Sequence, residues 1–100
     1  MGNHVGFLVK NEQAFLQLNR NSLDSYRKTV TLNERIKAIA NDTTASAETR
    51  KKKINDLVAA AQKECNLSKE MVEAYAEGAA ELKDGQGISS KLSNTMKTTT

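Results

Sequence analysis

The residues best suited to chemistry in this chain are four consecutive cations, Arg50 to Lys53. Guanidinium and ammonium groups bind phosphate and carboxylate oxygens through charge-assisted hydrogen bonds. The run falls in the first turns of a predicted helix, where positive charge opposes the helix dipole, so local helix stability does not account for it. It is interpreted either as an anion-binding surface or as a solvated charged face, because short basic runs also occur in proteins that bind no anion.

Charge is unevenly distributed along the chain, which carries a net charge of +3. Residues 1–53 contain ten lysines and arginines against five acidic residues, whereas residues 54–100 contain five against seven. Acidic residues spaced three or four apart form a stripe in the second half: Glu70, Glu73, Glu77, Glu81 and Asp84. This acidic stripe is interpreted as an ordinary solvated helix face or as a contact for a basic surface such as residues 50–53 of another copy.

Residues in a catalytic or metal-binding pattern are missing. His4 is the only histidine and has no cysteine near it in the sequence, so a metal site is not predicted. Cys65 lies on the apolar side of its predicted helix, as a small core residue does. Gly85 and Gly87 lack the flanking Lys-Ser/Thr of a phosphate-binding loop. The sequence therefore predicts a protein that is not an enzyme and that needs no cofactor.

The expected location is cytoplasmic, because the chain shows a single cysteine and no secretory signal peptide. No apolar run approaches the length that spans a bilayer, so membrane association is not expected. The start Met1-Gly2-Asn3 fits N-myristoylation only loosely, since Gly6 stands where Ser or Thr is expected. An acylated protein at a membrane surface is kept as a third interpretation.

The elements that must position these residues are all predicted to be helices, because the chain has no proline and twelve alanines. Segments 7–19 and 22–41 form one long helix or two, because the run Asn19-Arg20-Asn21-Ser22 between them is rich in capping residues. Within 22–41, Thr31 and Glu34 fit a capping box, so the helix either restarts at Thr31 or continues through it. In 22–41 an apolar stripe is expected, consisting of Leu23, Tyr26, Val30, Ile36 and Ala40.

Two further helices are predicted, at about 46–65 and 68–83. Residues 41–46 form a linker rich in candidate N-caps, and Ser68 is expected to cap the later helix. The helix at 46–65 has the clearest period, with apolar residues on one side: Ile54, Leu57, Val58, Ala61 and Cys65.

The Gly-, Ser- and Thr-rich residues 85–100 are predicted to be a flexible tail after a single helical domain at 1–84. Ile88, Leu92 and Met96 nevertheless recur every four residues. These three residues are therefore the candidate partner-binding residues, on a marginal helix that forms when a partner is bound.

Leu, Ile, Val and Phe together number twenty, and the chain contains no tryptophan. A core built from so few large side chains is thin, so a homodimer is expected to cover the remaining apolar surface. The predicted fold class is all-α, a small helical bundle of three to four helices with a long N-terminal pairing helix.

Residues 54–85, Ile-Asn-Asp-Leu-Val through Glu-Leu-Lys-Asp-Gly, resemble the C-terminal helix–turn–helix of small phage double-stranded-DNA-binding proteins of the T-even late-transcription type. They are also similar in outline to GapR-like nucleoid proteins. The resemblance covers about a third of the chain. It implies nucleic-acid contacts from the following basic residues: Arg50, Lys51, Lys52, Lys53, Lys63, Arg27, Lys28, Arg35 and Lys37.

Two functions are predicted from these features. The first is nonspecific binding of double-stranded nucleic acid, since lysines without interleaved aromatic residues suit phosphate contact rather than base reading. The acidic helix at 68–83 departs from this pattern. The alternative is a small phage or bacterial accessory protein that binds and modulates a host protein as an adaptor or inhibitor.

Overall fold

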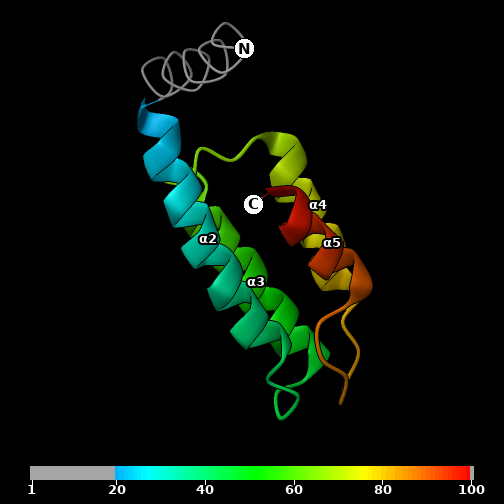
Figure 1. Ribbon diagram of the computed structural model, residues 1–100. Helices are drawn as coiled ribbons and strands as arrows, with labels where there is room; N and C mark the ends of the chain where they lie inside the picture. Colours follow the sequence, from blue (N-terminus) through cyan, green and yellow to red (C-terminus); the bar gives the residue numbers. More distant parts are fainter. Residues whose placement is uncertain (1–19, 100) are drawn as a thin grey trace, which may run out of the picture.

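The computed structural model describes residues 20–99, whose backbone forms helices joined by three loops (Figure 1). The helices are α2 (Arg20–Ala40), α3 (Ala47–Ala61), α4 (Lys69–Ala80) and α5 (Ser90–Thr99). No strand occurs among the described residues. The prediction of a small all-α bundle is confirmed. The predicted helix 7–19, and the interpretations placed on His4 and Gly2, fall outside the described residues.

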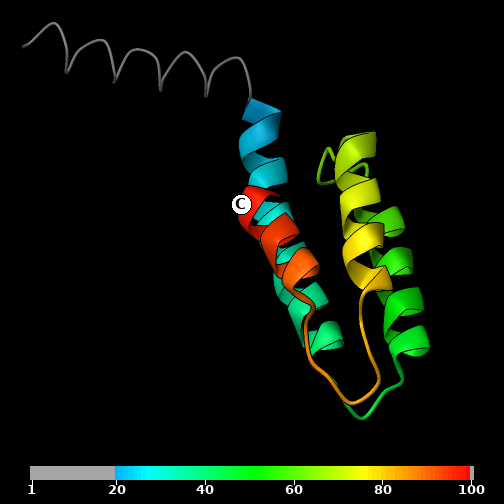
Figure 2. The same ribbon diagram turned by 90° about the vertical axis from the view of Figure 1, so that its right-hand side faces the viewer.

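The four helices run alternately up and down, so each lies antiparallel to the next in the sequence (Figure 1). Close backbone contacts join α2 to α3, α3 to α4, and α4 to α5. Turning the molecule by 90° shows α5 beside α2 and α4 beside α3 (Figure 2). The bundle is thus closed by α2 and α5, whose backbones lie further apart than those of the other neighbouring pairs.

The core lies on the inner sides of the four helices, as their apolar periodicity requires. Its members come from every helix and from the α3–α4 and α4–α5 loops: Leu32, Ile36, Ala40, Ile54, Val58, Cys65, Leu67, Tyr75, Ala79, Leu82, Leu92 and Met96. The stripe predicted for 46–65 is confirmed, because Ile54, Val58 and Cys65 are buried while Leu57 and Ala61 pack against them.

The helix ends follow the capping residues of the sequence. The Ser46 hydroxyl accepts the Thr49 N–H at 3.1 Å, and the Ser68 hydroxyl accepts the Met71 N–H at 3.2 Å. Each bond satisfies an N–H that the first helical turn leaves without a partner. At Thr31, in contrast, α2 continues unbroken, and the hydroxyl donates to the Arg27 carbonyl at 3.3 Å. A helix restart at Thr31 is therefore excluded.

The C-terminal segment differs from the flexible tail predicted for residues 85–100. Residues 90–99 form α5, and Leu92 and Met96 are buried in the core. Ser89 leads into the helix: its hydroxyl accepts the Leu92 N–H at 3.1 Å and donates to the Gly78 carbonyl at 2.8 Å. The four-residue apolar spacing does correspond to a helix. However, the surface that stabilises this helix is α4 of the same chain and not a separate partner. Isolated helices this short are marginal, whereas burial of one side stabilises them.

Gly78 sets how closely α4 and α5 approach. A Cβ atom at this position would lie 2.6 Å from the Leu92 Cα and 2.9 Å from the Leu92 nitrogen. Both are backbone atoms, so relief requires α5 to move as a whole. The helix-breaking residue that weakens α4 locally therefore permits its tertiary packing.

Replacing Gly78 with alanine should consequently destabilise the protein by about 1–3 kcal/mol through overpacking. Helix propensity alone predicts the opposite sign, a gain of about 1 kcal/mol. Urea unfolding distinguishes the two, with Glu73→Ala as a control on the exposed side of the same helix. A Gly78→Ala protein more stable than the wild type would show that α5 does not pack here.

Candidate functional site

Arg50, the first of the predicted nucleic-acid-binding cations, is a core residue and must be removed from that set. Its side chain is 0% exposed. The guanidinium donates from Nη1 to the carbonyls of Ala40 at 2.5 Å and Gln86 at 2.7 Å, from Nη2 to that of Lys83 at 2.7 Å, and from Nε to that of Ala45 at 3.1 Å. A side chain that is enclosed by backbone carbonyls of other residues in the same chain cannot contact a phosphate.

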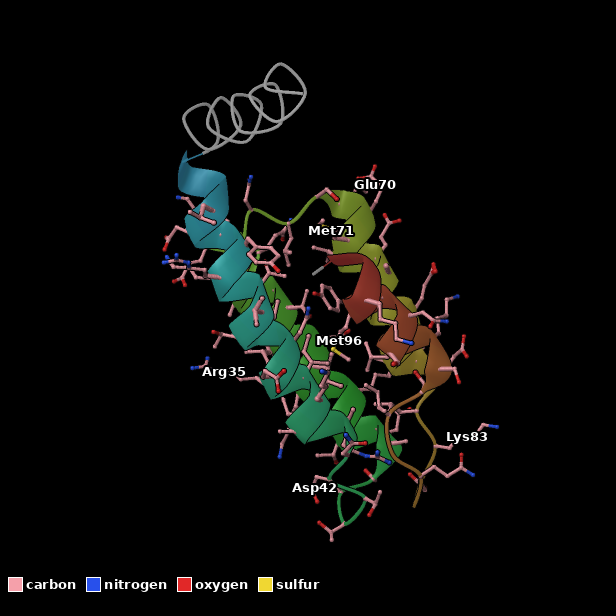
Figure 3. All side chains as sticks on the ribbon, viewed as in Figure 1. Arg35, Asp42, Glu70, Met71, Lys83 and Met96 are labelled. Atoms are coloured by element: carbon pink, nitrogen blue, oxygen red, sulfur yellow. The ribbon has the colours of Figure 1, made fainter. Side chains whose placement is uncertain are left out.

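These bonds belong to a polar junction between two loops, residues 41–46 and 81–89, which is called the loop junction below. The Asp84 carboxylate accepts the Ala47 N–H at 2.6 Å, and the Asn41 side-chain oxygen accepts the Ile88 N–H at 2.9 Å. Figure 3 shows Asp42 and Lys83 from the two loops at the same end of the bundle. Asp84 therefore lies at the positive end of the α3 dipole, where a carboxylate is stabilising.

The remaining cations of the basic run lie on separate sides of α3. Lys51 and Lys52 line a shallow hollow together with Glu48 and Asp56, and Lys52 Nζ lies 2.9 Å from the Asp56 carboxylate. Lys53 lies at the α2–α3 side, among Ala38, Ile39 and Asp42. Lys63 lies at the turn after α3, beside Ala59 and Asn66.

The cations of α2 are also divided between two sides. Lys28 and Arg35 line a depression toward α3, where Lys28 Nζ lies 3.2 Å from the Asp24 carboxylate. The hydrogen bond to Asp24 raises the pKa of Lys28. Lys37 faces the other side, 3.6 Å from the Glu34 carboxylate, in a groove toward α5. The predicted nucleic-acid residues thus do not share one surface, and several lie next to a carboxylate.

The acidic stripe of α4 is partly engaged within the chain. The Nζ atom of Lys91 on α5 lies 3.5 Å from the Glu77 carboxylate and 3.8 Å from the Glu81 carboxylate. Exposed pairs of this kind contribute little stability. Glu70, which Figure 3 shows at the far end of α4 from the loop junction, is exposed. The stripe is therefore partly a contact between α4 and α5.

The predicted partner-binding residues of the C-terminal segment are unavailable to a partner. Leu92 is 0% exposed and Met96 3% exposed, and Ile88 packs against the same core. Figure 3 shows Met96 on the inner side of α5, directed toward the α2 side of the bundle. This interpretation is therefore corrected, because their apolar surface is already covered by the other helices.

The accessible apolar surface lies instead on α2. Leu23, Tyr26 and Val30 are 37%, 48% and 37% exposed and, at spacings of three and four residues, lie on one side of the helix. These three residues are called the apolar side of α2 below. The sequence placed them on one stripe with Ile36 and Ala40, which are buried. That grouping was too wide, because residues thirteen apart on a helix, such as Leu23 and Ile36, point in clearly different directions.

A groove of about 340 Å³ between α2 and α5 adjoins this apolar side. It exists because the backbones of α2 and α5 do not approach each other as closely as those of the other helix pairs. Its lining combines apolar and polar side chains: Tyr26, Val30, Asn33, Glu34, Lys37, Ser93, Met96 and Lys97. No family model, curated protein or solved structure matches this chain. The resemblance of residues 54–85 to DNA-binding proteins remains a prediction.

Residues 20–99 contain no candidate metal site and no candidate membrane-spanning helix. No group of three or more His, Cys, Asp or Glu in this range has the arrangement of a metal site. None of the helices described here is long and apolar enough to cross a membrane. Cys65 is buried in the core, in the turn that follows α3.

A buried hydrogen bond that sequence patterns did not reveal lies behind the groove. The Tyr75 hydroxyl of α4 donates to the Asn33 side-chain oxygen of α2 at 2.6 Å. Tyr75 is 0% exposed and Asn33 3% exposed. The bond joins α2 to α4, which is not its neighbour in the sequence, at a residue that also lines the groove.

Removing this bond with Tyr75→Phe should cost about 1–2 kcal/mol, because a buried acceptor loses its donor. A double-mutant cycle with Asn33→Ala measures the pair directly by urea unfolding. A coupling near 1 kcal/mol is expected. Additive effects of the two substitutions would show that the hydroxyl and the amide do not interact.

Proposed function

We propose that this chain is a non-enzymatic protein that acts by binding a protein partner on the apolar side of α2, beside the α2/α5 groove. The observation that supports the proposal is the exposure of Leu23, Tyr26 and Val30. Among the described residues these are the large apolar side chains that remain exposed. Three such residues together on one helix side indicate a contact surface, whereas single exposed apolar residues do not.

The composition of the groove favours a helical protein segment as the ligand. Helix-in-groove recognition places the apolar side of an amphipathic helix into a groove and leaves polar groups at the rim. Here Tyr26 and Val30 supply the accessible apolar part, and Glu34 and Lys97 supply charges of opposite sign at the edges. An apolar centre with a polar rim is the usual anatomy of a protein interface.

Site-specific photocrosslinking in cells tests this proposal. A photoreactive phenylalanine analogue in place of Tyr26 should give protein adducts, whereas the same analogue in place of exposed Glu73 on α4 should not. Equal yields at both positions, or none at Tyr26, would contradict the proposal. Deleting residues 86–100 is unsuitable as a test, because α5 forms part of the core.

A second candidate function is nonspecific binding of double-stranded nucleic acid. It is supported by Lys28 and Arg35, which lie two helical turns apart on the same side of α2 and line one depression. Arg27 on α2 and Lys53 on α3 are also exposed. Phosphate contacts of this kind weaken steeply as salt is raised.

A mobility-shift titration at two salt concentrations examines this candidate. The double variant Lys28→Gln/Arg35→Gln should bind duplex DNA more weakly and with a smaller salt dependence than the wild type. Lys63→Gln, an exposed cation at another site, serves as the control. No retardation of the wild type at low salt would dismiss nucleic-acid binding.

A further inference from the structure

We propose that the partner on the apolar side of α2 is a second copy of this chain, bound in an antiparallel two-fold dimer. This inference rests on the proposed function, since it names the occupant of the same surface. Leu23, Tyr26 and Val30 follow the spacing i, i+3, i+7, which is the spacing of the contact positions in a helix pair. The α2 helix of a second copy carries the same apolar side and can therefore pack against this surface.

The charges beside this surface distinguish an antiparallel from a parallel pair. Arg27 and Glu34 are exposed, lie seven residues apart on the same edge of α2, and enclose Val30 between them. Seven residues span two turns, or about 10.5 Å, which is too far for these side chains to pair readily within one chain. In an antiparallel pair centred near Val30, each Arg27 faces Glu34 of the other copy. In a parallel pair, Arg27 and Glu34 of one copy lie on the opposite side of the interface from the same residues of the other copy, so neither charge meets its opposite.

Both charges are available for this contact. Arg27 forms no ion pair with any residue that the structure describes. Glu34 lies 3.6 Å from Lys37, but their side chains are 68% and 50% exposed. An exposed pair three residues apart is weak and leaves the carboxylate accessible to a second cation. The apolar side of α2 with Arg27 and Glu34 on its edge is thus complementary to itself.

Light scattering of the full chain over a range of concentrations tests the dimer. The wild type should reach twice the chain mass of 11.0 kDa. Val30→Asp should give the monomer mass, since it places a charge at the centre of the interface. Lys63→Glu also introduces a negative side chain, but at a distant exposed site, and should leave the dimer intact.

The charge pair is tested by exchange. Arg27→Glu should raise the dimer dissociation constant at least about tenfold, because it sets two glutamates opposite each other. The double variant Arg27→Glu/Glu34→Arg should restore dimerisation. The two-fold axis relates the two charge pairs, so the double variant restores opposite charges in both of them. A double variant that dimerises no better than Arg27→Glu would overturn the antiparallel arrangement.

The remaining outcomes separate this inference from the proposed function. A wild type that stays monomeric while the analogue at Tyr26 crosslinks to another protein overturns the dimer and retains the proposed function. A monomer without adducts overturns both. A monomer that Val30→Asp destabilises in urea at every concentration also overturns the dimer, because another part of the same chain then covers the surface.

Discussion

Replacing Arg50 with alanine should lower the free energy of unfolding by about 3–5 kcal/mol, the largest effect expected of any single substitution in this chain. The guanidinium joins the end of α2 and both loops of the junction through the carbonyls of Ala40, Ala45, Lys83 and Gln86. Removing it leaves one buried and three partly buried carbonyls without this donor, and it creates a cavity where the side chain is now enclosed. Urea unfolding followed by circular dichroism measures the change.

Arg50→Lys should recover only part of this loss. An ammonium is a compact charge, whereas the planar guanidinium presents donors in several fixed directions at once. Lys53→Ala, three positions later on an exposed part of the same helix, is the matched control and should change stability by less than about 0.5 kcal/mol. If Arg50→Ala proved as mild as this control, the residue would not be buried in solution and the anion-binding interpretation of the basic run would regain support.

Leu92→Ala is expected to have the second-largest effect, a loss of about 2–5 kcal/mol. Leu92 is 0% exposed, and its backbone lies against Gly78 at the contact between α4 and α5. Truncating it removes buried apolar surface and leaves a cavity that the rigid helix contact cannot close. The same urea experiment measures the loss.

Asn94→Ala, an exposed substitution two residues later on α5, provides the comparison and should be nearly neutral. A Leu92→Ala protein as stable as this control would mean that residues 90–99 do not pack on the bundle. The original expectation of a flexible tail would then hold. A large loss would instead confirm that the protein needs its last helix to fold.

Both substitutions affect the connection between α4 and α5. Arg50 binds the loop that leads from α4 toward α5, and Leu92 anchors the helix that follows it. The position of α5 therefore depends on contacts at both the loop junction and the α4 surface. Because α5 forms one wall of the α2/α5 groove, either substitution should also weaken partner binding there, which makes Val30→Asp the cleaner probe of function.

Local chemistry was sufficient to predict the helices and several of their ends. The absence of proline and the apolar spacing of Ile54, Val58 and Cys65 predicted α3, Ser68 was correctly identified as a cap, and Ser46 belonged to a linker rich in candidate caps. These features depend on residues within one or two helical turns of each other, so the order of residues determines them. The four-residue spacing of Leu92 and Met96 indicated only a marginal helix that forms on a partner, in a segment predicted to be flexible, whereas residues 90–99 form α5 against the core of the same chain.

Which surfaces remain exposed was decided only by the tertiary structure. Arg50 belonged by sequence to a basic run, yet its neighbours Lys52 and Lys53 are exposed while it binds carbonyls from loops up to 36 positions away. Leu23, Tyr26 and Val30 matched a core pattern, but no described helix covers that side of α2. Periodicity shows that a helix has an apolar side, but burial depends on which other elements reach that side. This chain uses α5 to complete its core and leaves the apolar side of α2 exposed.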